Sequence, residues 1–195
     1  MKVIVEPHNP AWHVLFTKYR TNLERILEGI PIVSIEHVGS TSIPGLLAKP
    51  ILDIDIIVKP ESVQSASEAL VAAGYENRGN KGVPDRTIFR QPGLARRYRG
   101  IESTKDDEED LEIIRNTYLV LDGSPALRNH LDLKRMMLEN ADLRDEYGEV
   151  KRKLVESGVE DVDEYCMGKN EVMLKILRKA GWTEDELEEV RKANE

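Results

Sequence analysis

The chain has 195 residues and a mass of 22.2 kDa, the size of one ordinary domain with at most a small appendage. Hydrophobic residues make up 40% and charged residues 33%, so the bulk of the chain can bury a core and is not disordered. The single cysteine, Cys166, excludes an internal disulfide and a thiolate metal site. No segment approaches the roughly 18 apolar residues of a membrane-spanning helix, so we expect a cytoplasmic protein without membrane contacts.

The net charge of -8 is distributed unevenly along the chain. Residues 1–100 contain 13 Lys and Arg against 10 Asp and Glu, whereas residues 101–195 contain 15 against 26. Because nucleic-acid binding depends on neutralising phosphates, the acidic second half argues against a nucleic-acid partner. Any anionic ligand is expected to bind the first half.

The first predicted elements are a helix and a strand. Asn9-Pro10 is a typical helix start and Gly29 a typical end. Between them, apolar residues follow at helical spacing: Trp12, Leu15, Phe16, Tyr19, Leu23 and Ile26. Residues 31–38 predict a strand that leads into a Gly-Ser-Thr-Ser turn at 39–42.

Residues 51–59 predict a second strand, in which successive side chains point to opposite faces. One face carries Leu52, Ile54, Ile56 and Val58. The other face carries Ile51, Asp53, Asp55 and Ile57. Two ionised carboxylates side by side on a strand suited to burial are unfavourable without a cation or a basic partner. The pattern therefore favours a ligand site at this pair of aspartates.

The rest of the pattern predicts a mixed sheet followed by helices. Extended segments are expected at 75–78, 86–90 and 111–121, helices at 62–73, 124–140, 141–156 and 162–180, and a capping box at 183–186 that opens a final helix. The fold class is α/β (α+β), a mixed β-sheet flanked by helices with a C-terminal helical tail. We place a domain boundary near Gly123, which gives domains 1–122 and 123–195, with a single domain 1–195 as the alternative.

The spacing between the turn and the second strand points to phosphate chemistry. Backbone N–H groups exposed after Gly39-Ser40, together with the dipole of a following helical turn, suit phosphate oxygens. After a gap of 12 residues, Asp53 and Asp55 supply the hard oxygen ligands that Mg²⁺ prefers. Together these parts suit a metal-bound nucleoside triphosphate that is attacked at its α-phosphate.

This arrangement resembles the signature of the nucleotidyltransferase superfamily that includes polymerase-β-like enzymes. More specifically, the sequence IEHVGSTSIPGL at 35–46, followed by AKPI at 48–51 and DID at 53–55, resembles the GrpB family of predicted nucleotidyltransferases. The resemblance covers most of the chain and implies a nucleotidyltransferase-like fold. The family domain also occurs fused to dephospho-CoA kinase, as a suggested folding accessory, which makes that kinase a candidate partner.

Two departures from the family pattern lie in later elements. The strand before Gly123-Ser124 is histidine-rich in the family but contains no histidine here, at residues 116–121. In the next helix, the Arg-Asp pair that the family pattern predicts reads Lys134-Arg135, so a basic residue replaces an acidic one. Whatever those family residues do, this chain does it differently or not at all.

Enzymes that deprotonate an incoming hydroxyl usually carry a third carboxylate on a later strand. The candidates are Glu112, near the start of the strand at 111–121, and Asp122 just past its end. We choose Glu112, whose structural alternative is a place in a solvated acidic loop. The predicted catalytic set is thus Asp53, Asp55 and Glu112, with the two aspartates binding Mg²⁺ or Mn²⁺.

Seven residues are candidates for binding the nucleotide: Gly39, Ser40, Thr41, Ser42, Lys49, Arg86 and Arg90. The guanidinium forks of the arginines suit phosphate oxygens, although a solvated basic loop is an equal alternative for them. Gly39 also fits a tight turn, and the two hydroxyl residues after Ser40 also fit helix caps. Lys49 is placed equally well on the surface. His37, alone on its strand, is expected to be structural.

Two functions remain open at this stage. The first is transfer of a nucleoside monophosphate from a nucleoside triphosphate to an unknown acceptor, either a small molecule or a protein. The second is a non-catalytic nucleotide-binding or protein-folding accessory module, which the lack of a clearly placed third carboxylate favours. Template-free polymerisation of nucleic acid is weaker, because the tail is acidic and lacks a basic platform interleaved with aromatic residues.

Overall fold

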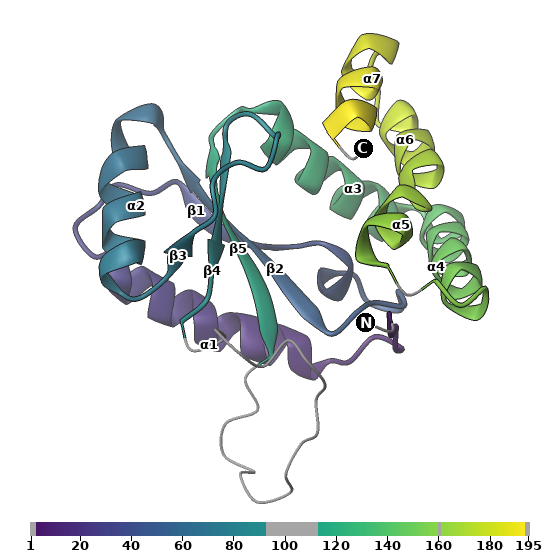
Figure 1. The fold of residues 1–195 in the computed structure, drawn as a ribbon, viewed down its shortest axis with the longest axis horizontal. Coiled ribbons are helices and arrows are strands. Elements are labelled where there is room, and N and C mark those ends of the chain that lie inside the picture. The colour runs from purple at the N-terminus through teal and green to yellow at the C-terminus, as the bar shows by residue number, and fades with distance from the viewer. Residues whose placement is uncertain (1–2, 93–112, 160, 194–195) are drawn as a thin grey trace, which may run out of the picture.

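The computed structural model describes residues 3–92, 113–159 and 161–193, whose strands form one sheet in the order β1-β2-β5-β4-β3 (Figure 1). The strands are β1 (Ser34–Val38), β2 (Ile51–Val58), β3 (Glu76–Asn77), β4 (Arg86–Arg90) and β5 (Ile114–Leu121). The helices are α1 (Ala11–Ile26), α2 (Val63–Ala72), α3 (Pro125–Glu139), α4 (Ala141–Glu156), α5 (Val162–Met167), α6 (Asn170–Lys179) and α7 (Glu184–Ala193), with short 3₁₀ turns η1 (Ser40–Ser42) and η2 (Pro60–Ser62).

The sheet is mixed. β2 pairs antiparallel with β1 and parallel with β5, and β4 pairs antiparallel with β5 and with β3. The predicted fold class, a mixed sheet with flanking helices and a helical C-terminal region, is therefore confirmed.

The main core lies between one face of the sheet and the helices α1 and α2. As the alternation predicted, this face of β2 carries Leu52, Ile54, Ile56 and Val58, all completely buried. They pack against Trp12, Phe16, Tyr19 and Leu23 of α1 and Ala66 and Leu70 of α2. Both aspartates of β2 consequently point to the opposite face.

That opposite face is covered by α3 and bordered by the last four helices, which Figure 1 shows gathered beside one end of the sheet. α3 packs Ala126 and Leu127 against Ile57 and Val120 of the sheet. Helices α3, α4 and α6 enclose a second cluster that includes Ile43 and Leu46, from the segment just after η1. The helical region is thus anchored directly behind the predicted phosphate-binding turn.

Three details differ from the predicted elements. The helix expected at 162–180 is two helices, α5 and α6, which are separated by a turn at Gly168 and Lys169. β5 begins at Ile114, and residues 93–112 lie outside the described part of the chain. The extended segment at 75–78 shortens to two residues. Among the described residues, no helix is long and apolar enough to cross a membrane.

The capping box at 183–186 is confirmed. The backbone N–H of Thr183 donates to the Glu186 carboxylate at 2.7 Å, and the backbone N–H of Glu186 donates to Thr183 Oγ1 at 3.3 Å. These reciprocal bonds satisfy amide groups that the first turn of α7 would leave unpaired.

We predict that Leu23→Ala lowers the free energy of unfolding by about 2–5 kcal/mol, because Leu23 is completely buried between α1 and the sheet. Val14→Ala is the matched control on the same helix, since Val14 is 68% exposed, and its effect should stay within about 0.5 kcal/mol. Urea unfolding followed by circular dichroism measures both. Equal effects would show that α1 does not pack as described.

Candidate functional site

Asp53 is held at the centre of the sheet by groups from β5. The parallel register places Asn116 directly beside Asp53 and Tyr118 beside Asp55. Asn116 Nδ2 donates to Asp53 Oδ1 at 2.9 Å, and the Tyr118 hydroxyl lies 3.4 Å from the same oxygen. Burial raises the pKa of Asp53, and the Asn116 hydrogen bond only partly opposes that shift. The groups around Asp53 therefore do not fully stabilise its negative charge.

Asp55 is completely buried and contacts a histidine from α3. His130 Nδ1 lies 2.8 Å from Asp55 Oδ2 and 3.1 Å from Oδ1, and its ring is tilted against that of Tyr118 with centroids 5.4 Å apart. The sequence offered no signal for this contact, because the two residues are 75 positions apart and His130 has no metal-ligand spacing around it.

Gly39 brings the turn after β1 into contact with Asp53. Its φ of +67° lies in the left-handed region, and a Cβ at this position would collide with Asp53 Oδ2 and stand 2.9 Å from Asp53 Cβ. Only glycine satisfies both requirements. The residue therefore acts as a tight turn and, at the same time, sets the distance between the turn and the carboxylate.

Thr41 and Ser42, which follow Ser40, donate side-chain hydrogen bonds to backbone carbonyls. Ser42 Oγ donates to the carbonyl of Gly39 at 2.6 Å, and Thr41 Oγ1 donates to the carbonyl of Ile51 at 3.1 Å. Since the single hydroxyl hydrogen of Thr41 is used in that bond, His37 Nε2, 3.0 Å away, must carry the hydrogen that Thr41 Oγ1 accepts. These bonds tie the turn to the start of β2.

His37 is buried, stacked on Phe16 with ring centroids 4.8 Å apart, and neutral at physiological pH. Burial, and then the charge of Lys134, lower its pKa from 6.5 to about 4. Lys134 Nζ donates to the backbone carbonyl of His37 at 2.7 Å. Lys134, which stands where the family pattern has an arginine, thus supports β1 just before Gly39.

Ser40 contacts a lysine that the sequence did not reveal. Lys151 of α4 is 2% exposed, and its Nζ donates to Ser40 Oγ at 2.5 Å and to the carbonyl of Leu47 at 2.8 Å. Lys49 and Lys169 lie on the ring of Tyr165, with Nζ 5.0 Å and 4.6 Å from its centroid. Lys49, which was predicted to bind phosphate, is therefore close to the turn. The helical periodicity of the sequence alone places Lys151 on an ordinary helix face.

The other predicted residues occupy different positions. Arg86 lies over the Tyr118 ring, 4.9 Å from its centroid, and so borders the site. Arg90 stands one strand beyond Asn116 and is 3.8 Å from Glu76 of β3. Glu112 lies outside the described residues, and its alternative, Asp122, is exposed after the end of β5. The sequence analysis also overlooked Glu36, which the antiparallel register places directly across from Asp55.

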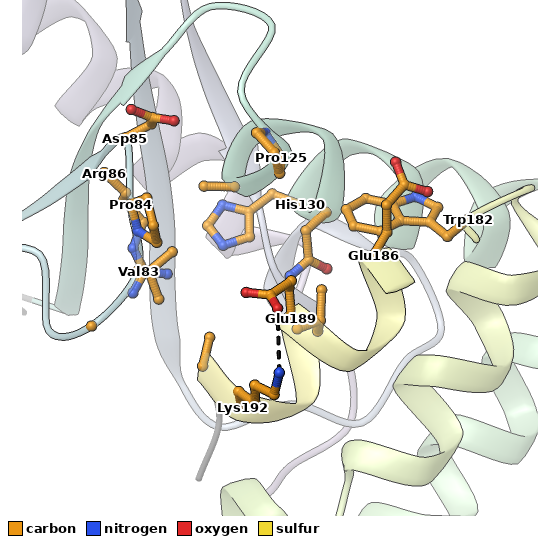
Figure 2. A pocket seen from close by; sticks show the side chains of 15 residues that line it. Val83, Pro84, Asp85, Arg86, Pro125, His130, Trp182, Glu186, Glu189 and Lys192 are labelled. Atoms are coloured by element: carbon orange, nitrogen blue, oxygen red, sulfur yellow. Dashed lines mark hydrogen bonds and ion pairs between the residues drawn. The ribbon is translucent and has the colours of Figure 1, made fainter. Parts of the chain in front are cut away.

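His130, which contacts Asp55, also lines a cavity of about 410 Å³ (Figure 2). The loop carrying Val83, Pro84 and Arg86 forms one wall, and α7 forms the other. In Figure 2, His130 lies between these two walls. The same view shows the pair formed by Glu189 and Lys192 on α7. Most of the lining is apolar, with a few polar groups, as in typical sites for small molecules.

The donor set fits a hard divalent cation. Two carboxylates of one strand face offer oxygen ligands, and the under-compensated charge of Asp53 is what a cation would neutralise. Within the described ranges there is no cluster of three or more His, Cys, Asp or Glu side chains arranged around one point. A cation at this site would therefore take its remaining ligands from phosphate oxygens and water.

We predict that Gly39→Ala destabilises the protein more than Gly29→Ala. Both glycines have positive φ values, +67° and +80°, so both variants lose at least about 1 kcal/mol from backbone strain. At Gly39 a ψ of −174° adds to the strain, and a Cβ would collide with Asp53, whereas nothing lies within 4 Å of a Cβ at Gly29. Chemical denaturation of both variants measures the two losses, and equal losses would contradict the contact.

We also predict a pH dependence of stability that originates at His37. The unfolded side chain titrates near pH 6.5 and the folded one near 4, so below 6.5 protons bind the unfolded state preferentially. The free energy of unfolding should therefore fall as pH falls from 6.5 towards 4, by up to about 1.4 kcal/mol per pH unit. His37→Gln keeps a donor for Thr41 but cannot titrate. Wild type and variant with parallel pH profiles would refute this assignment.

The comparisons with known proteins agree with these sequence patterns. The family model described as GrpB protein matches residues 2–179. The UPF0157 protein SCO7215 of Streptomyces coelicolor is 31% identical over 183 residues, which cover 93% of this chain and 86% of that protein. The UPF0157 protein YqkA of Bacillus subtilis is 28% identical over 171 residues, which cover 87% of this chain but only 45% of that protein.

A solved structure shares the fold. The crystal structure of the conserved protein GrpB from Enterococcus faecalis aligns with a TM-score of 0.72 and 23% sequence identity, covering 92% of this chain and all of that chain. The match over residues 2–179 and the 31% identity to the Streptomyces protein both indicate the same family. The chain belongs to the GrpB family.

Proposed function

We propose that this protein is a metal-dependent nucleotidyltransferase that transfers a nucleoside monophosphate from a nucleoside triphosphate to a small-molecule or protein acceptor. The observation that carries the proposal is the contact between Gly39 and Asp53, which joins a phosphate-binding type of turn to a pair of carboxylates, one half-buried and one completely buried. In the reaction, an acceptor oxygen attacks the α-phosphorus, the bond to the bridging oxygen breaks, and pyrophosphate leaves.

Asp53 and Asp55 would hold Mg²⁺ or Mn²⁺, which when bound neutralises charge on the α-phosphate. Asn116 and Tyr118 hold one oxygen of Asp53 in place, which leaves Oδ2 directed at the Gly39 turn. His130 orients Asp55 in the same way. The chain's own residues thus fix both carboxylates before any ligand arrives, a preorganisation that favours charge stabilisation.

The cavity beside His130 supports a small acceptor. Within β2, Asp53 lies beside Gly39, whereas Asp55 contacts His130, which lines the cavity. Attacking and leaving groups of an in-line displacement occupy opposite sides of the phosphorus. If the leaving pyrophosphate lies by the Ser40 turn, the acceptor approaches from the cavity, whose rim includes the acidic side chains of Asp85, Glu186 and Glu189.

One observation favours the second function, a non-catalytic nucleotide-binding or folding accessory module. The β5 residue next to Asp53 is Asn116, whose amide donates a hydrogen bond and cannot accept a proton from an attacking hydroxyl. An accessory module would bind nucleotide without releasing pyrophosphate, and dephospho-CoA kinase is the partner to test for it. Pyrophosphate release therefore separates the two functions.

We predict that Asp53→Asn and Asp55→Asn abolish Mg²⁺-dependent pyrophosphate release and the Mg²⁺-dependent thermal shift with ATP, GTP, CTP or UTP. Removing one charge from each carboxylate weakens cation binding, while the amide keeps the shape of the side chain. Asp122→Asn is the matched control, because Asp122 is exposed beyond the end of β5 and should leave both signals unchanged.

Activity retained by Asp53→Asn would contradict the proposed metal role. A nucleotide-induced shift in wild type, without pyrophosphate release with small-molecule and protein acceptors, would favour the accessory module.

A further inference from the structure

Three lysines beside the Ser40 turn form no ion pair with a carboxylate in the part of the chain that the structure describes. Lys49 precedes β2, Lys151 belongs to α4, and Lys169 precedes α6. With respect to the residues that the structure describes, none of their ammonium groups lies within 4 Å of an acidic oxygen, whereas most surface lysines and arginines of α3, α4, α6 and α7 do pair with acids. These three ammonium groups are therefore not paired with the many acidic side chains of the described helices.

Two of the three lysines, Lys49 and Lys169, contact the ring of Tyr165. Its ring is 1% exposed, and Lys49 Nζ and Lys169 Nζ lie 5.0 Å and 4.6 Å from its centroid, so the two nitrogens are within about 10 Å of each other. The Lys151 Nζ lies 4.5 Å from the centroid of the Tyr147 ring. Cation–π contacts fix the position of an ammonium group without removing its charge.

The cluster is electrostatically unfavourable without a ligand. Loss of hydration is the main cause that lowers the pKa of all three lysines, and repulsion from Lys169 adds to it for the other two. Asp53 is the carboxylate whose charge opposes this shift at each lysine. One carboxylate cannot balance three ammonium groups, so the cluster has the capacity to bind a multiply charged anion.

The cluster lies where the phosphate tail of a nucleotide would lie. Lys151 Nζ contacts Ser40 Oγ at 2.5 Å, and Ser40 follows Gly39, which contacts Asp53. A chain of phosphates that begins at the carboxylates therefore meets first the turn and then the lysines. Three cations with one hydroxyl suit two adjacent phosphate groups better than a single carboxylate.

We propose that Lys49, Lys151 and Lys169 form a subsite for the β- and γ-phosphates of a nucleoside triphosphate, supplied mainly by helices α4 to α6 rather than by the sheet. The identification of the ligand as a nucleotide rests on the proposed function, whereas binding of a polyphosphate does not. Because these lysines recognise charge alone, the subsite should bind inorganic tripolyphosphate without a base, a sugar or a divalent cation.

The test uses thermal unfolding and calorimetric titration with tripolyphosphate in the presence of a chelator. Lys49→Gln and Lys169→Gln should each weaken tripolyphosphate binding about tenfold or more, and each should raise the melting temperature of the ligand-free protein, because a repelling charge is removed. A purely structural lysine would lower that temperature instead. Lys151→Met is a further variant, and the two glutamine variants keep the test decisive if it does not fold.

Lys153→Gln is the matched control, because Lys153 lies on the same helix as Lys151, is 70% exposed, and stands 3.6 Å from Glu149. It should bind tripolyphosphate as wild type does. Unchanged binding in Lys49→Gln and Lys169→Gln would overturn the subsite and leave the proposed function standing. Tripolyphosphate binding by Asp53→Asn, together with no pyrophosphate release by wild type, would uphold the subsite and overturn the transferase. Absence of binding to wild type would overturn the subsite outright.

Discussion

The contact between the backbone of Gly39 and the carboxylate of Asp53 is the constraint on which the rest of the site depends. It requires a left-handed turn directly after β1, and it requires β1 and β2 to pair in the register that sets Val38 opposite Asp53. The surrounding bonds all serve this register: His37 and Thr41 tie the turn to β2, and Lys134 braces β1 from α3. The buried and neutral state of His37 follows from that structural role.

The helical region contributes to the site as much as to the fold. Ile43 and Leu46 follow the turn and pack among α3, α4 and α6, so the same hydrophobic cluster that anchors these helices also places Lys151 against Ser40. Residues 101–195 carry a large excess of acids, and many acids of the described helices pair with basic side chains on the surface, whereas Lys151 is buried beside Ser40. Net charge along the chain therefore describes the outer surface and not the interior, which is why the sequence analysis confined anion binding to the first half.

The sequence could predict what depends on local pattern. Alternation along β2 assigned the faces of Asp53 and Asp55 correctly, and the capping box and most helices follow from local spacing. The contacts of His130 and Lys151 depend on how α3 and α4 cross the sheet, and no local pattern encodes that crossing. The break between α5 and α6 at Gly168 was also missed.

The identity of the residue beside Asp53 decides what chemistry the site can perform. A carboxylate at position 116 would complete a set of three acids, but it would also add a third negative charge to a buried face where the pKa of Asp53 is already raised. The amide of Asn116 instead stabilises the charged form of Asp53 through its hydrogen bond. The residue beside Asp53 therefore orders the carboxylate pair but cannot accept a proton.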